Sequence, residues 1–148
     1  FARDPQGGDT DQLRGIVSGE CPIAVSNTYY FARALRKDVD GLSGSTDGIG
    51  WVFPNQSGRG AHVNVSVGAV TANAPNRDNA VRFLEYLASD SAQEYFSEGN
   101  DEYPAVPGVA LSDSVSALGL FRQDALNLSA LGENQDAAVR IYDAVGYE

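Results

Sequence analysis

The stretch PIAVSNTYYFARALR, from Pro22 to Arg36, carries the clearest indication of the fold. Its first five residues are apolar at nearly every position, which is typical of a buried strand in a parallel sheet. Asn27 follows as a favourable N-cap, and the residues after it predict a helix whose last turns carry the basic side chains that suit a helix C-terminus. A shorter helical pattern precedes the strand and ends at Gly19. A helix, a strand and a second helix in succession predict an α/β architecture.

The rest of the chain continues this mixture of strands and helices. Trp51–Phe53 and Ala61–Thr71 have the composition of strands, the second with valines on one face and polar side chains on the other. Helical spacing of apolar residues predicts one helix after Asn76, a second after Ser89, and a third over Glu133–Asp143. We find no internal repeat.

Capping and loop residues set the expected ends of several elements. Asp9 or Thr10 is expected to cap the first helix, after an opening loop, and Gly146 is expected to stop the last one. Pro104 and Pro107 leave only short helical turns between the second and third of the later helices.

Composition excludes several classes of function. The 148 residues are 43% hydrophobic, which is enough for a buried core, and 20 acidic against 10 basic residues give a net charge of −10. Because binding to nucleic acid or to an anionic membrane surface needs clustered Lys and Arg, neither partner is expected. No window approaches the length of apolar sequence that a membrane span requires, so we expect no direct insertion into a membrane.

The sequence contains few residues or motifs that would indicate an enzyme. His62 is the only histidine and lies within a strand pattern, where a structural role is the more common one. Cys21 is the only cysteine, so it cannot form an internal disulfide, and its place before a strand predicts a buried, inert thiol. Nucleophile-elbow, phosphate-loop and zinc-protease motifs are missing from the sequence. We therefore expect a binding protein and no catalysis.

Tyr29 and Tyr30 stand in the first turn of the helix that follows the predicted strand. In open α/β sheets, ligands bind at this edge, where strands lead into helices. A helix N-terminus favours a phenolate over a phenol, and phenolate oxygen suits a hard, highly charged cation such as ferric iron. Packing remains the alternative role for such a pair, because tyrosines often fill cores and surfaces.

Nine short segments, spread over nearly the whole chain, form an ordered set. They are Phe1–Arg3, Gly7–Thr10, Gly19–Ala24, Asn27–Tyr30, Phe53–Gln56, Gly58–Asn64, Asn79–Leu84, Glu102–Pro104 and Gly132–Gln135. In this order they resemble the ferric-iron-binding proteins of bacterial iron(III) ABC transporters.

The resemblance implies a type II periplasmic-binding-protein fold, transferrin-like and two-lobed, of which residues 1–148 would be the second half. Residues 1 to about 55 and 133–148 would then form the ligand-bearing C-terminal lobe, and residues 61–132 the hinge strand and the return to the other lobe. Such a protein is expected to work as a monomer that hands iron to an ABC permease in the inner membrane. It would be periplasmic, or tethered by lipid outside a Gram-positive cell.

The resemblance also implies the site. Tyr29 and Tyr30 would supply two phenolate ligands to Fe³⁺, and Asn27 would help to hold a synergistic anion, although a plain N-cap role is an equal alternative. Where phosphate-using members have a second asparagine this chain has Asp9, so carbonate, or no anion, is expected. Glu102 and Tyr103 belong to a motif that is not a standard ligand set, and we expect them to pack or to lie near the hinge. Remaining ligands would come from the first half, and not from His62.

Two alternatives stay open at this stage. A related receptor for an organic anion, a polyamine or a sugar would have no use for an adjacent pair of phenols. A metal-dependent enzyme would need acid and base residues upstream of this chain.

Overall fold

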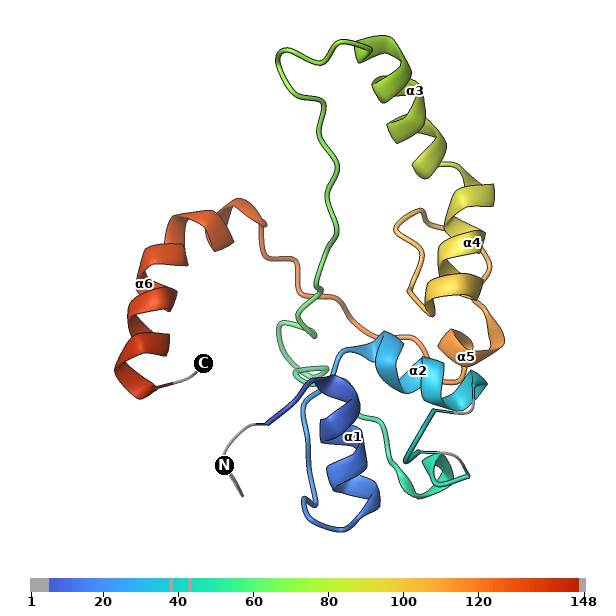
Figure 1. Ribbon diagram of the computed structural model, residues 1–148, viewed down its shortest axis with the longest axis vertical. Coiled ribbons are helices and arrows are strands. Elements are labelled where there is room, and N and C mark those ends of the chain that lie inside the picture. The colour runs from blue at the N-terminus through green and yellow to red at the C-terminus, as the bar shows by residue number, and fades with distance from the viewer. Residues whose placement is uncertain (1–5, 38, 43, 147–148) are drawn as a thin grey trace. The chain divides into compact units, whose positions relative to one another are not determined.

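The computed structural model describes residues 6–37, 39–42 and 44–146, and Figure 1 draws its helices. The loop predicted for the opening residues 1–5 lies outside the described residues. Contacts divide the chain into two units: the first joins Phe1–Val52 with Ser66–Leu120, and the second joins Phe53–Val65 with Phe121–Glu148. These units do not coincide with the predicted lobes, and the assignment of residues to lobes stays a prediction.

In the first unit, α1 spans Asp9–Val17 and buries Leu13 on its inner face. The prediction that Asp9 or Thr10 caps this helix is wrong, because both are helical and Gly8 precedes them at the N-cap. Ser18 is the C-cap and Gly19 follows it at φ +75°, so the predicted glycine stop is confirmed.

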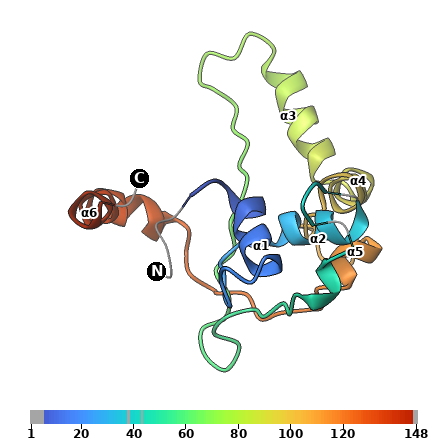
Figure 2. The same ribbon diagram turned by 60° about the horizontal axis from the view of Figure 1, so that its bottom comes forward.

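Helix α2 spans Thr28–Arg36, as predicted, and lies beside α1 in both ribbon views (Figures 1 and 2). Asn27 is its N-cap by backbone conformation, with φ −71° and ψ 145°, but its side chain makes no capping hydrogen bond. The buried face carries Phe31 and Ala32, and the Phe31 ring stacks on Trp51 at a centroid distance of 5.5 Å. A short 3₁₀ turn, η1, follows at Thr46–Gly48.

The helices predicted after Asn76 and Ser89 are confirmed as α3, Arg77–Leu87, and α4, Asp90–Asn100. The Ser89 side chain accepts a hydrogen bond from the Ala92 N–H and so caps α4. Only one short helix, α5 at Asp113–Ser116, follows before the second unit, which agrees with the expected short turns. It packs against α2 (Figure 2).

In the second unit, α6 spans Ser129–Val145 and begins four residues before the predicted Glu133. The earlier start has a local cause, because the Asn127 side chain accepts a hydrogen bond from the Ser129 N–H at 3.0 Å. Gly146 ends the helix in the left-handed conformation, as predicted.

The other segments of the second unit meet at a parallel β-bridge between Ala61 and Gln123. Ala61 N–H donates to Arg122 O at 2.9 Å, and Asp124 N–H donates to Ala61 O at 2.8 Å. Gly60, at φ +99°, lies so close to the Gln123 backbone that a Cβ would stand 2.6 Å from its carbonyl carbon. The close approach therefore requires glycine here.

The strands predicted at Pro22–Ser26, Trp51–Phe53 and Ala61–Thr71 are wrong as paired strands, since only Ala61 enters a bridge in the described part of the chain. The first is also not buried: Ile23 is 84% exposed and Val25 is 90% exposed. A strand is stabilised by the neighbour that pairs with it, and apart from the bridge at Ala61 the described residues contain no such neighbour for these segments.

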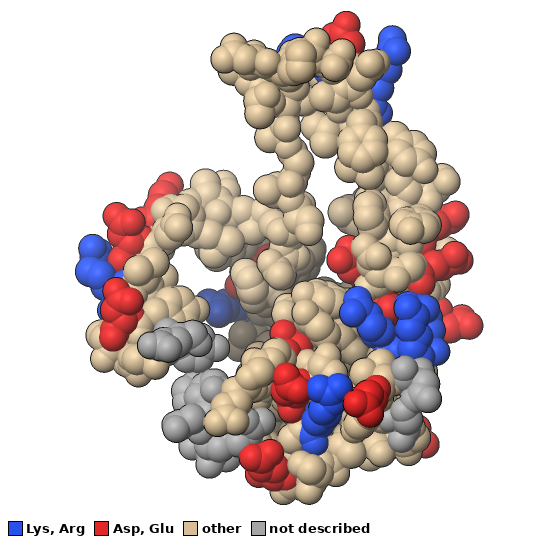
Figure 3. Space-filling model, in the orientation of Figure 1, with Lys and Arg blue, Asp and Glu red and all other residues tan. Residues whose placement is uncertain are grey.

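The distribution of charged side chains and the hydropathy of the helices agree with what the sequence predicts. On the face drawn in Figure 3, acidic side chains are spread over several elements, and Lys and Arg form small separate groups. Among the described residues, no helix has the length and apolar character needed to cross a membrane.

Candidate metal-binding site

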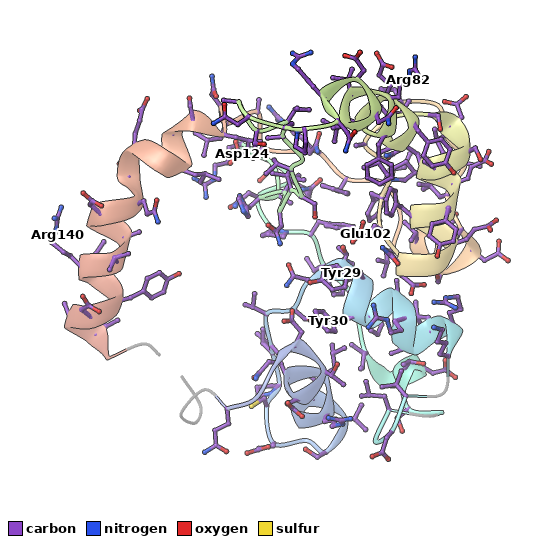
Figure 4. All side chains as sticks on the ribbon, turned by 45° about the horizontal axis from the view of Figure 1, so that its top comes forward. Tyr29, Tyr30, Arg82, Glu102, Asp124 and Arg140 are labelled. Atoms are coloured by element: carbon purple, nitrogen blue, oxygen red, sulfur yellow. The ribbon has the colours of Figure 1, made fainter. Side chains whose placement is uncertain are left out.

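Tyr29 and Tyr30 lie together at the start of α2 (Figure 4). Both side chains are partly exposed, their ring centroids are 4.5 Å apart, and the rings are tilted by 35°. Sequence neighbours in a helix diverge by about 100°, so this proximity is possible only because the side chains turn toward one another at the end of the helix. The pair thus presents two phenol oxygens from one edge of α2.

The surroundings of Tyr29 keep its hydroxyl protonated in the absence of metal. Burial raises the pKa of Tyr29, and the hydrogen bond and charge of Tyr30 raise it further, with smaller contributions from Asp9 and Glu102. Figure 4 shows Glu102 close to Tyr29. Electron-rich oxygens therefore surround this hydroxyl, and a bound cation would relieve their mutual repulsion.

Asp9 reaches the N-cap of α2 from the first turn of α1. Its Oδ1 accepts a hydrogen bond from the Asn27 N–H at 2.5 Å and another from Asn27 Nδ2 at 3.1 Å. This explains why neither side chain caps its own helix. Asn27, the predicted anion-binding residue, therefore already donates two of its N–H groups to the carboxylate of Asp9.

Asp101 is a part of this region that the sequence did not reveal. It is fully buried, and Arg36, the last residue of α2, donates to both of its oxygens at 2.8 Å. Burial alone would raise the pKa of Asp101, but the hydrogen bonds from Arg36 and Ser114 and the charge of Arg33 outweigh burial and lower it. The carboxylate is thus ionised and paired. A basic residue at a helix end hints at such a pair, but its acidic partner is 65 residues away.

Tyr103 has a structural role, as expected. Its hydroxyl donates to the Gly119 carbonyl at 2.6 Å, and burial raises the pKa of Tyr103 to about 12. A phenol that is held by a carbonyl and resists ionisation is a poor candidate for a metal ligand.

The sequence analysis also singled out a histidine and a cysteine, and each has its own surroundings. His62 is exposed and lines a shallow hollow of the second unit with Gln123 and Asp124. Cys21 is a free thiol that is partly exposed, so the prediction that it is buried is wrong. Over residues 6–37, 39–42 and 44–146, no group of three His, Cys, Asp or Glu side chains is placed to hold a metal ion.

The chain belongs to the bacterial extracellular solute-binding proteins, because residues 9–123 match the model of that family. It is also similar to individual proteins named for iron uptake and for ferric iron binding. It is 46% identical over 151 residues to iron uptake protein A2 of Synechocystis sp., covering 100% of this chain and 43% of that protein. Against the major ferric iron-binding protein of Neisseria meningitidis serogroup B the identity is 26%, covering 90% of this chain and 39% of that protein.

Solved structures of iron-binding proteins are also similar to this chain. A Trichodesmium protein in complex with iron and citrate superposes with a TM-score of 0.92 at 44% identity, covering 100% of this chain and 47% of that one. The ferric binding protein of Campylobacter jejuni gives a TM-score of 0.90 at 37% identity, with 100% and 47% covered. The chain therefore spans about half the length of the relatives that it matches.

These comparisons confirm the predicted resemblance and the periplasmic-binding-protein fold class. They also support the choice of a binding protein over an enzyme, since the relatives are named for iron uptake and ferric iron binding. The roles of Tyr29, Tyr30 and Asn27 stay predictions.

Proposed function

We propose that this chain contributes Tyr29 and Tyr30 as phenolate ligands to a ferric ion, in a protein that captures iron for uptake. The observation that carries the proposal is the pair itself: two adjacent, partly exposed phenols, with ring centroids 4.5 Å apart, at the N-terminus of a helix. Relatives named for ferric iron binding and iron uptake support the choice of metal.

The chemistry of the pair fits Fe³⁺. Metal binding must displace a proton from each phenol, and a trivalent cation offsets the cost of placing two negative oxygens side by side. A neutral organic ligand would gain no such advantage from the pair. The remaining coordination positions would be filled by groups outside these 148 residues.

The proposal includes an anion beside Asn27, with carbonate as the expected species. Asp9 takes one N–H of the Asn27 side-chain amide, and that amide carries a second N–H with which it can donate to an anion. Where an asparagine amide would donate to a phosphate oxygen, the carboxylate of Asp9 has no N–H to donate and repels the anion, which disfavours phosphate at this place. The solved relative with iron and citrate is one in which iron is accompanied by an anion.

The proposal extends to delivery of iron to an ABC permease and to a location outside the cytoplasm. The family is named for extracellular solute binding, and the Synechocystis relative is named for iron uptake. Both names support a receptor that is periplasmic, or tethered by lipid in a Gram-positive cell.

The direct test is a visible absorption spectrum of the full-length protein titrated with ferric citrate. We expect a broad tyrosinate-to-iron charge-transfer band in the parent and its loss when Tyr29→Phe and Tyr30→Phe are combined, because phenylalanine keeps the rings and removes the donors. Tyr86→Phe is the matched control, since Tyr86 is 56% exposed on α3.

Two results would overturn the assignment. A double variant that keeps the band of the parent would show that other residues bind the iron. A colourless parent would favour a related receptor for another small ligand.

A further inference from the structure

Asp101 joins three helices of the first unit at one buried point. It follows α4 in a left-handed conformation, with φ +62°, and is fully buried. Arg36 Nε and Nη2, at the end of α2, donate to its two oxygens at 2.8 Å each, and Ser114 Oγ of α5 donates to Oδ1 at 2.9 Å. A two-pronged pair between a guanidinium and a carboxylate fixes orientation as well as distance.

The far end of α2 carries the tyrosines. Tyr29 and Arg36 are seven residues apart, so about two helical turns bring them to the same face of α2. An anchor at Arg36 therefore fixes the rotation of the helix about its own axis, and with it the direction in which Tyr29 leaves the helix. Arg33 reinforces the link, with Nε 3.9 Å from Asp101 Oδ2 and its guanidinium 5.8 Å from the centroid of the Tyr30 ring.

We propose that Asp101 is a positioning residue of the iron site, which acts through Arg36 to hold α2 so that both phenol oxygens reach one metal ion. This inference rests on the proposed function of the tyrosine pair.

The test compares variants of the full-length protein loaded with ferric citrate. Asp101→Asn removes the charge, and Arg36→Met removes the two donors while leaving Ser114 bonded to Asp101, so that a fold lost in the first variant does not end the test. The matched control is Arg59→Met, because Arg59 pairs with Asp124 at 3.3 Å in the other unit and is 73% exposed. The readouts are the wavelength of the charge-transfer band, the rate of iron release to a competing chelator, and Tm.

We expect a shifted band and iron release about tenfold faster in both variants, the low end of the 10–100-fold effects of residues that orient metal ligands. The variant that combines Asp101→Asn with Arg36→Met should release iron no faster than the faster of the two single variants. Both changes break the same ion pair, so their effects should not add. The control should match the parent.

The two proposals fail in different ways. If the parent is coloured and both variants keep its band and release rate while Tm falls, Asp101 is a purely structural residue and this inference is wrong, with the tyrosine assignment intact. A colourless parent overturns the tyrosine assignment itself, and this inference with it.

Discussion

Replacing Tyr103 by phenylalanine should separate the structural tyrosine from the proposed ligands. The hydroxyl of Tyr103 donates to Gly119 O at 2.6 Å, and removing it leaves that carbonyl without this donor. We expect the free energy of unfolding at pH 8 to fall by about 1.5 kcal/mol, the usual cost of losing such a hydrogen bond. The charge-transfer band with ferric citrate should not change.

The same variant has a second effect, which depends on pH. The folded protein holds the Tyr103 proton up to a pKa of about 12, whereas the unfolded chain loses it near pH 10. The unfolded state thus loses its proton first, and the parent loses stability as pH rises through this range, while Tyr103→Phe lacks this contribution. Between pH 8 and pH 11 the loss is about 1.4 kcal/mol, so the parent's advantage should nearly vanish at pH 11.

Urea unfolding of parent and variant at pH 8, 9, 10 and 11 measures this difference directly, because the effects of the other tyrosines and of Lys37 cancel in the comparison. A stability gap that stays constant across the series would refute the raised pKa. A gap near zero at pH 8 would refute the contribution of the hydrogen bond to Gly119. A weakened iron band would contradict the division of roles among the tyrosines.

Three further predictions address the site and its support. Single Tyr29→Phe and Tyr30→Phe variants should each bind iron at least about 100-fold more weakly, beyond the range for residues that only orient ligands, as measured by chelator competition. Phosphate should not slow iron release from the parent, but should slow it about fivefold in Asp9→Asn, where ~1 kcal/mol of charge repulsion is gone; equal responses would count against a role for Asp9 in anion choice. The lowered pKa of Asp101 stabilises the fold above pH 4 and this stability is lost on further acidification, so Tm should depend less on pH between 5 and 3 in Asp101→Asn.

Helices were predictable from this sequence because their determinants are local. Helices α3 and α4 begin directly after Asn76 and Ser89, as expected, and Gly146 ends α6 as expected. Where the predicted boundaries failed, a particular side chain explains it. Asp9 bonds to Asn27 instead of capping α1, and Asn127 extends α6 toward the N-terminus.

The site was predictable only in part. Position at a helix N-terminus and a family resemblance single out Tyr29 and Tyr30, and the structure brings their rings together. The hydrogen bonds of Asp9 with Asn27 and the ion pair of Asp101 with Arg36 span 18 and 65 residues of sequence. Contacts at such separations depend on how helices pack, and a residue pattern does not encode that packing locally.

The segments around Val25 and Val67 show the same difference between local and distant interactions. Their composition is a local property, whereas their burial depends on residues far away in the sequence. Val25 and Val67 are 90% and 88% exposed, although the apolar, β-branched residues around them are typical of strands. Burying such side chains is favourable by roughly 25 cal/mol for each Å² removed from water, but only if a facing surface exists. The chain covers 43% of the Synechocystis relative and 47% of the Trichodesmium one. Among the described residues these segments have the composition of strands but no facing surface, so their apolar side chains stay exposed, in a chain that covers less than half of either relative.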